Sequence, residues 1–190
     1  MLGRHSEAIA KILQARRLEP LSVPINAFVA YIYLVARQYD HAVAAADRAI
    51  ELEPRSALAH WYLGRAYSFQ EKWSDAIDAL QQGGCLSDDL ALCKGDLALA
   101  LRRAGQQARA ELVLQRLQQT SVEQYVSPCH MGRAHLGAGN QEVALVFLDR
   151  AANQRIPLAL GLADPEFDEL RRQRGFRELC ARLNVPAIRP

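Results

Sequence analysis

The chain has 190 residues, half of them apolar and 23% charged, which is typical of a soluble globular protein with one sizeable core or a short repeat array. Lys and Arg number 23 against 21 Asp and Glu, so the net charge of +2 gives no overall attraction to nucleic acid or to an anionic membrane. No apolar run approaches the roughly 20 residues of a bilayer span, and charges interrupt the N-terminal segment where a signal peptide would be apolar, so we expect a cytoplasmic protein.

Apolar periodicity and breaker residues predict helices along most of the chain. A lone helix is expected over residues 4–18. Helix pairs follow over residues 23–36 and 39–52, 57–70 and 73–85, 90–104 and 107–119, and 125–138 and 141–154. Pro20 and Pro54 are expected to end helices, and Gly105 and Gly139 to mark turns inside pairs. Gly83 and Gly84 predict that the helix over 73–85 frays early.

Small residues recur along the chain at a constant spacing of about 34 residues, which indicates a repeat architecture. One column contains Ala8, Ala42, Ala76, Ala110 and Ala144. A second column, twelve positions earlier, contains Ala30, Gly64, Ala98 and Gly132. Glycine costs about 1 kcal/mol inside a helix relative to alanine. We therefore interpret Gly64 as a packing residue that lets two helices approach to about 8–10 Å.

These columns resemble the tetratricopeptide repeat family. The resemblance implies an all-α fold, a right-handed superhelix of one half repeat and four helix pairs. The predicted array covers residues 1–156, with the half repeat at 1–20 and repeats at 23–54, 57–88, 91–122 and 125–156. Residues 157–190 are predicted to form a two-helix C-terminal capping segment.

The tail sequence "ADPEFDELRRQRGFRELC" carries a second resemblance. Its pattern D-P-x-F-D-x-L-R, then F-x-x-L, is similar to a tail behind tetratricopeptide arrays in bacterial winged-helix regulators, nucleotide cyclases and Ser/Thr kinases. Asp164 fits an N-cap with Pro165 in the first helical position. One apolar face is predicted for the last helix, on Phe176, Leu179, Cys180 and Leu183. The spacer "RQRG" lacks the start signal that this pattern often carries.

The predicted helix over residues 4–18 has no preceding partner helix in the sequence. Ile9, Ile12 and Leu13 would then form an apolar stripe. Three outcomes follow: the helix frays, it pairs with a second copy as a homodimer, or a preceding domain of a longer protein covers it. We favour the last two, because the repeat spacing continues back to Ala8.

No motif for catalysis, a metal or a cofactor stands out, so we expect a protein that is not an enzyme. In "CHMGRAH" the two histidines are five residues apart, which places them on different faces of a helix. "HLGAGN" lacks the lysine and the preceding strand of a phosphate loop. The four cysteines form no CxxC pair and are expected to be reduced.

The family resemblance implies that the first helix of each pair lines a concave groove. Six residues are the predicted partner-binding residues: Tyr31, Trp61, Arg65, Phe69, Arg102 and Arg133. Aromatic and arginine side chains are enriched at interaction hot spots, and the arginines predict an acidic partner segment with an apolar anchor. The alternative is that the aromatics belong to the core and the arginines pair with the chain's own carboxylates.

The predicted function is protein–protein interaction, as a sensory or scaffolding part of a bacterial signalling or transcription-control system. One alternative is the C-terminal portion of a cyclase or kinase whose catalytic domain lies upstream. Another is a self-assembly scaffold. The lysine and asparagine of a chaperone-binding carboxylate clamp are not at the matching groove positions, which argues against a chaperone adaptor.

Overall fold

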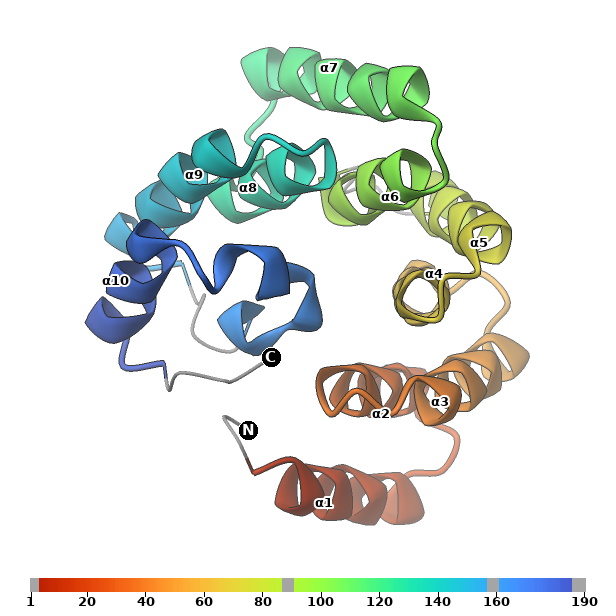
Figure 1. The fold of residues 1–190 in the computed structure, drawn as a ribbon. Coiled ribbons are helices and arrows are strands. Elements are labelled where there is room, and N and C mark those ends of the chain that lie inside the picture. The colour runs from red at the N-terminus through yellow and green to blue at the C-terminus, as the bar shows by residue number, and fades with distance from the viewer. Residues whose placement is uncertain (1–3, 87–90, 157–160, 186–190) are drawn as a thin grey trace.

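The structure is a computed structural model that describes residues 4–86, 91–156 and 161–185. Every regular element in these ranges is helical. The repeat region contains α1 (His5–Leu18), α2 (Val23–Val35), α3 (Tyr39–Leu52), α4 (Ala57–Phe69), α5 (Trp73–Leu86), α6 (Ala91–Arg103), α7 (Gln107–Glu123), α8 (Pro128–Gly137) and α9 (Gln141–Asn153). The tail contains two 3₁₀ helices, η1 (Gly161–Ala163) and η2 (Pro165–Leu170), followed by α10 (Arg174–Arg182). The repeat helices form an arc, and η1 and η2 lie inside it (Figure 1).

The small-residue columns lie where the two helices of a pair cross. A Cβ added at Gly64 would lie 2.5 Å from Leu80 Cγ and 3.0 Å from the carbonyl oxygen of Ala76 on α5. A Cβ at Gly132 would lie 3.2 Å from the carbonyl oxygen of Ala144 on α9. The alanines of both columns that fall in α2 to α9 are fully buried: Ala30, Ala42, Ala76, Ala98, Ala110 and Ala144. The predicted packing role of these positions is confirmed.

The turn inside each pair repeats as well. Arg37, Glu71, Gly105 and Gly139 all have positive φ, at 60°, 60°, 76° and 91°. The next residue in each turn donates its backbone N–H to a carbonyl five positions back, as Gln38 does to Tyr33 and Gln106 does to Leu101. This is the Schellman pattern that closes a helix C-terminus. Gly105 and Gly139 were predicted as turns, whereas Arg37 and Glu71 adopt the same conformation without glycine's freedom.

The connections between pairs are fixed by side chains of the following helix. Asn26 Nδ2 donates to the carbonyl oxygen of Pro20 at 3.0 Å, and His60 Nε2 lies 3.0 Å from that of Pro54. Both prolines follow the last turn of a helix, as predicted. Asn26 and His60 are both buried, and each ties its helix to the end of the one before it.

Three of the predicted helix boundaries are wrong, and one of them is the start of α8, which lies at Pro128 instead of residue 125. Helix α5 continues through Gly83 and Gly84 to Leu86 instead of fraying early. A Cβ at Gly83 would lie 3.1 Å from the carbonyl oxygen of Ala57 and 3.2 Å from Trp61 N, so this glycine is also a close-packing position. Helix α7 extends to Glu123, beyond the expected end at residue 119.

The third and fourth pairs do not stack like the others. Helix α8 packs on α6 as extensively as on its own partner α9, and its contact with α7 is small. The backbones of α6 and α8 approach closely at two glycines. A Cβ at Gly95 would lie 3.0 Å from Ala134 N, and one at Gly137 would overlap the carbonyl oxygen of Gly95. This close approach brings the concave sides of α6 and α8 together.

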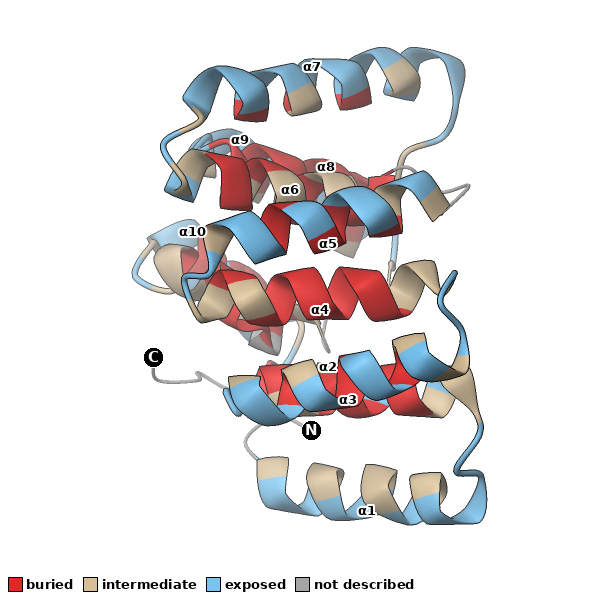
Figure 2. Cartoon of the chain, turned by 90° about the vertical axis from the view of Figure 1, so that its right-hand side faces the viewer, coloured by how far each residue is buried: buried red, intermediate tan, exposed pale blue. Residues whose placement is uncertain are grey.

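Helix α1 lies at the open end of the arc and contains no fully buried residue, in contrast to α4 (Figure 2). Ile12 and Leu13 are partly buried and pack against the main core cluster, so α2 covers part of the predicted stripe. The most exposed large apolar side chains at this end are Leu18 and Leu21, at 78% and 72%.

We predict that Gly64→Ala destabilises the protein by about 1–3 kcal/mol, because the added methyl group overpacks the crossing of α4 and α5. Gly84→Ala is the matched control. Its Cβ would meet only the Cβ of Cys93 at 3.8 Å, an ordinary contact, so helix propensity makes this change neutral or stabilising. Urea unfolding of both variants measures the difference. Equal stabilities would contradict the assigned crossing.

Candidate partner-binding groove

The concave surface formed by α2, α4, α6 and α8, which we call the groove, is occupied by the tail. Asp164 caps η2, since its side chain accepts the backbone N–H of Glu166 at 3.2 Å. Pro165 follows in the first helical position, as the sequence predicted. The backbone of this segment places Asp164, Glu166 and Asp168 two residues apart, and all three carboxylates meet arginines of the repeat region.

The deepest contacts form a buried ionic cluster between the groove and the tail. Arg65 Nη2 on α4 lies 2.5 Å from Asp164 Oδ2, and Arg65 Nε lies 3.3 Å from Asp96 Oδ1 on α6. Arg133 Nη2 on α8 donates to Glu166 Oε2 at 2.7 Å and lies 3.6 Å from Asp96 Oδ2. The Arg65 side chain is only 1% exposed and that of Arg133 12%. Three helices and the tail therefore meet at these five side chains, which we call the ionic cluster.

Aromatic rings form the floor beside the ionic cluster. The rings of Tyr31, Tyr62 and Trp61 follow one another, with centroids 5.5 Å and 4.9 Å apart. The guanidinium carbons of Arg65 and Arg133 lie 5.1 Å and 5.3 Å from the Trp61 ring centroid, within cation–π distance. Trp61 Nε1 donates to Asp96 Oδ2 at 2.7 Å, which links the floor to the charges.

Burial and charge shift the pKa values in this region in opposite directions. Burial, with the Asp164 carboxylate nearby, raises the pKa of Tyr31, and burial raises the pKa of Tyr62 to about 12. Burial alone would raise the pKa of Asp96, but the guanidinium groups of Arg65 and Arg133 outweigh it and lower that pKa. Burial raises the pKa of Glu166 well above its ordinary value despite Arg133, and the nearby carboxylates of Asp164 and Asp96 add to this shift.

The rim of the groove holds the tail through more exposed ion pairs. On one side, Arg37 Nη2 donates to both oxygens of Asp168, at 2.9 and 2.7 Å. On the other side, Glu169 pairs with Arg103, and its Oε1 lies 3.6 Å from Arg102 Nη2. Arg37 is the left-handed residue of its turn, and this conformation places its side chain at the rim.

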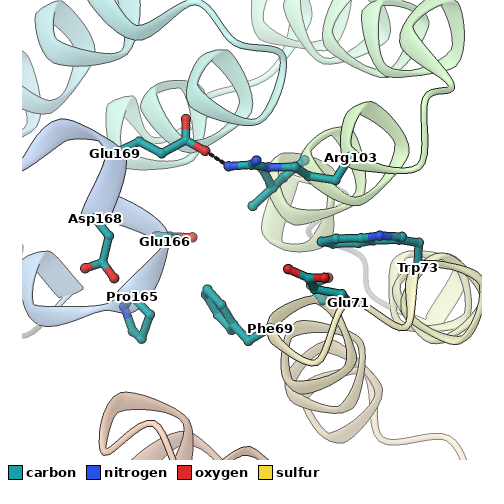
Figure 3. Close-up of a pocket in the computed structure, with 10 residues that line it drawn as sticks. Phe69, Glu71, Trp73, Arg103, Pro165, Glu166, Asp168 and Glu169 are labelled. Carbon is teal, nitrogen blue, oxygen red and sulfur yellow. Dashed lines mark hydrogen bonds and ion pairs between the residues drawn. The ribbon is translucent and has the colours of Figure 1, made fainter. Parts of the chain in front are cut away.

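A cavity of about 240 Å³ lies at this rim between the tail and α4 to α6. Figure 3 shows Pro165, Asp168 and Glu169 of the tail on one side and Phe69, Glu71 and Trp73 on the other, with the Arg103–Glu169 pair along one edge. The tail therefore leaves space between itself and this part of the groove wall.

The tail also has an apolar side, which packs against the last repeat. Phe167 and Leu170 are buried in a cluster with Leu136, Leu148, Phe176 and Leu179. The rings of Phe167 and Phe176 have centroids 5.9 Å apart. Helix α10 starts at Arg174 without a side-chain cap, as the missing start signal predicted, and covers this end of the array. The tail is thus both a cap on the last repeat and the occupant of the groove.

The structure brings four of the six predicted groove residues together, namely Tyr31, Trp61, Arg65 and Arg133. Phe69 lies farther out, stacked on Tyr39 at 5.3 Å and lining the cavity. Arg102 lies on the opposite rim, where its Nε donates to the carbonyl oxygen of Gly137 at 2.8 Å. The alternative interpretation, in which these arginines pair with the chain's own carboxylates, describes the observed contacts.

Sequence reasoning missed Asp96, Glu166 and Arg37. Asp96 gives a weak signal, because it is an acidic residue within the apolar part of α6. Glu166 sits in the quoted tail motif, but at the position where the motif accepts any residue. Arg37 lies in a turn, where an exposed charge is the ordinary expectation.

Neither a metal site nor a membrane-spanning helix is found in the described part of the chain. Within residues 4–86, 91–156 and 161–185, no three His, Cys, Asp or Glu side chains gather as a metal ion would require. Over the same residues, each helix is too short or too polar to pass through a bilayer.

Comparison with known proteins identifies the fold. No protein-family model matches the chain. Among solved structures it is similar to MamA, with a TM-score of 0.56 and 21% identity over 80% of this chain and 90% of that one. TTC0263, a tetratricopeptide protein of Thermus thermophilus, gives a TM-score of 0.63 and 18% identity over 85% and 89%. YrrB, described as a tetratricopeptide protein with an unusual peptide-binding site, gives 0.52 and 17% over 92% and 91%.

These likenesses confirm the predicted fold class. The chain is an all-α tetratricopeptide superhelix. At sequence identities of 17–21%, the similarities to these structures establish the fold and nothing more.

We predict that Arg65→Met lowers the free energy of unfolding by about 3–5 kcal/mol, because it leaves the carboxylates of Asp164 and Asp96 buried without their main cation. Adding Asp164→Asn in the same chain should recover part of that loss. Arg174→Met is the control, since Arg174 pairs with Glu178 at the surface, and it should unfold like the wild type. Urea unfolding that gives Arg65→Met and Arg174→Met the same stability would contradict a structural role for the ionic cluster.

Proposed function

We propose that this protein is an interaction module that binds an acidic partner segment with an apolar anchor in its groove. One observation carries the proposal: the groove already holds a segment of this chemistry, the chain's own tail. Asp164, Glu166 and Asp168 supply the charges, and Phe167 between them is an apolar side chain buried in the cluster with Leu136 of α8 and Phe176 of α10. The tail thereby serves as a template for the partner's chemistry.

The wider role that we propose is a sensory or scaffolding part of a cytoplasmic bacterial signalling or transcription-control system, acting by binding rather than catalysis. Its support is the resemblance of the tail to those behind arrays in such proteins. YrrB, whose described peptide-binding site lies in a related fold, supports a peptide-like partner. A partner would have to compete with the tail, which benefits from being tethered to the same chain.

The competition can be measured with a fluorescein-labelled peptide of residues 161–173 as the probe. The full-length chain carrying Asp168→Asn and Glu169→Gln, called the rim variant, has a weakened tail but an intact ionic cluster. We predict that the peptide binds the rim variant more tightly than it binds the wild type, as measured by fluorescence anisotropy, and that added salt weakens this binding.

The control peptide has amides in place of the carboxylates of Asp164, Glu166 and Asp168. It should bind neither protein, because it cannot pair with Arg65, Arg133 or Arg37. If the rim variant keeps its helical circular dichroism but binds both peptides equally, the groove does not select acidic segments.

Self-association through the N-terminal half repeat is a second proposal. It rests on the half-covered stripe of α1 and on the strongly exposed Leu18 and Leu21 at the same end. A two-fold contact needs only one self-complementary patch. We predict a concentration-dependent dimer in sedimentation and a monomer for Ile9→Glu/Ile12→Glu. A wild type that remains monomeric at every concentration would exclude this pairing.

A further inference from the structure

The charges of the ionic cluster do not balance when every group is ionised. Arg65 and Arg133 supply two positive charges, whereas Asp96, Asp164 and Glu166 supply three negative ones. All three carboxylate side chains are at most 6% exposed. An excess charge in so buried a place is strongly unfavourable, and it is usually removed by binding a proton.

The contacts indicate which carboxylate holds the proton. Asp96 accepts from Trp61 Nε1 at 2.7 Å and lies beside both arginines. Asp164 is paired with Arg65 at 2.5 Å and accepts the backbone N–H of Glu166. Glu166 is different, because Oε2 accepts from Arg133 whereas the buried Oε1 has no hydrogen-bond partner among the described residues. The Glu166 carboxyl is therefore the group whose negative charge is least compensated.

Among the described residues, Arg65 and Arg133 are the cations that act on the Glu166 carboxyl. Arg65 on α4 lies 3.7 Å from its Oε2, Asp96 faces it from α6, Arg133 and Cys129 face it from α8, and Asp164 precedes it in the tail. Only the two arginines are positive, and both are shared with the aspartates. The raised pKa of Glu166 agrees with this charge count.

We infer that the tail docks in the groove together with one bound proton, held by the Glu166 carboxyl, so that rising pH releases the tail and opens the groove to a partner. The opening to a partner rests on the proposed function, whereas the proton-linked docking stands on the ionic cluster alone. The proton therefore behaves as a ligand that binds the docked state, and its binding site is the Glu166 carboxyl beside Arg133.

The direction of the pH dependence follows from linkage. Below the ordinary pKa of glutamate, Glu166 is protonated whether the tail is docked or free, and docking is at full strength. Between that value and the raised pKa, only the docked tail keeps its proton, so the equilibrium constant for docking falls by about tenfold per pH unit. Above the raised pKa it falls no further. The lowered pKa of Asp96 acts only at more acidic pH, outside this window.

Glu166→Gln in the full-length chain tests the proton, because the amide resembles the protonated acid and cannot ionise. Urea unfolding is measured from about pH 5 to pH 8 for the wild type and for this variant. We expect the ratio of their folding equilibrium constants, wild type over variant, to fall with rising pH by up to about tenfold per unit. Glu169→Gln, a rim carboxylate outside the ionic cluster whose side chain is 29% exposed, is the matched control and should change in parallel with the wild type. If the ratio for Glu166→Gln is constant over this range, the inference is wrong.

Trp61 reports release of the tail without any partner. The Trp61 ring contacts the two arginines that pair with the tail carboxylates, and the residue is 7% exposed. The chain has two tryptophans, so Trp73→Phe leaves Trp61 as the single fluorescent tryptophan. In the rim variant the tail has lost its ion pairs at the rim and dissociates from the groove more readily. Acrylamide quenching of Trp61 in this variant should increase severalfold as the pH rises. Adding Glu166→Gln should abolish this increase, while circular dichroism shows an intact array. Quenching that stays constant with pH, or that rises equally with Gln in place of Glu166, would overturn proton-linked release.

These outcomes are separate from those of the peptide experiment. Failure of the labelled peptide to bind would contradict the proposed partner chemistry but leave the pH dependence of Trp61 quenching in place. Flat quenching with normal peptide binding would contradict the proton site alone.

Discussion

The buried contact between Arg65 and the carboxylates of Asp164 and Asp96 joins parts of the protein that are far apart in sequence. Arg65 belongs to the second full repeat, Asp96 to the third, and Asp164 to the tail. Charges this deeply buried stabilise only when they are well paired, because removing them from water costs several kcal/mol for each ion. The contact therefore makes the curvature of the array and the position of the tail depend on each other.

The close approach of α6 and α8 supports this arrangement. Without a side chain at Gly95 or Gly137, the two helices come near enough for Asp96 and Arg133 to meet across them. The irregular third repeat thus has a structural consequence in the groove, where it brings a negative side chain from α6 between two arginines. The ionic cluster therefore depends on the glycines that let α6 and α8 approach each other.

The repeat helices and the crossings within pairs could be predicted from the sequence, because they depend on local and periodic signals. Constant spacing placed Gly64, Ala76 and their equivalents at helix crossings, where the structure has them. The predicted early end of α5 failed because Gly83 was judged by its helix propensity alone. Its buried contact with the backbone of α4 outweighs that cost. Arg37 and Glu71 likewise occupy left-handed turn positions that only the repeat spacing, aligned with Gly105 and Gly139, could have indicated.

The groove residues could be predicted individually, but their partners could not. Periodicity places Tyr31, Arg65 and Arg133 on the concave side, yet it says nothing about a segment that follows the last repeat and turns back into the arc. The tail was interpreted as a cap from its apolar face, and Phe176 and Leu179 do cover the last repeat. Its acidic face was interpreted as capping residues, because a helix N-cap and a groove ligand both call for aspartate. In this structure Asp164 does both: one oxygen caps η2 and the other pairs with Arg65. Such a double role leaves no separate signal in the sequence, since the local requirement alone accounts for the residue.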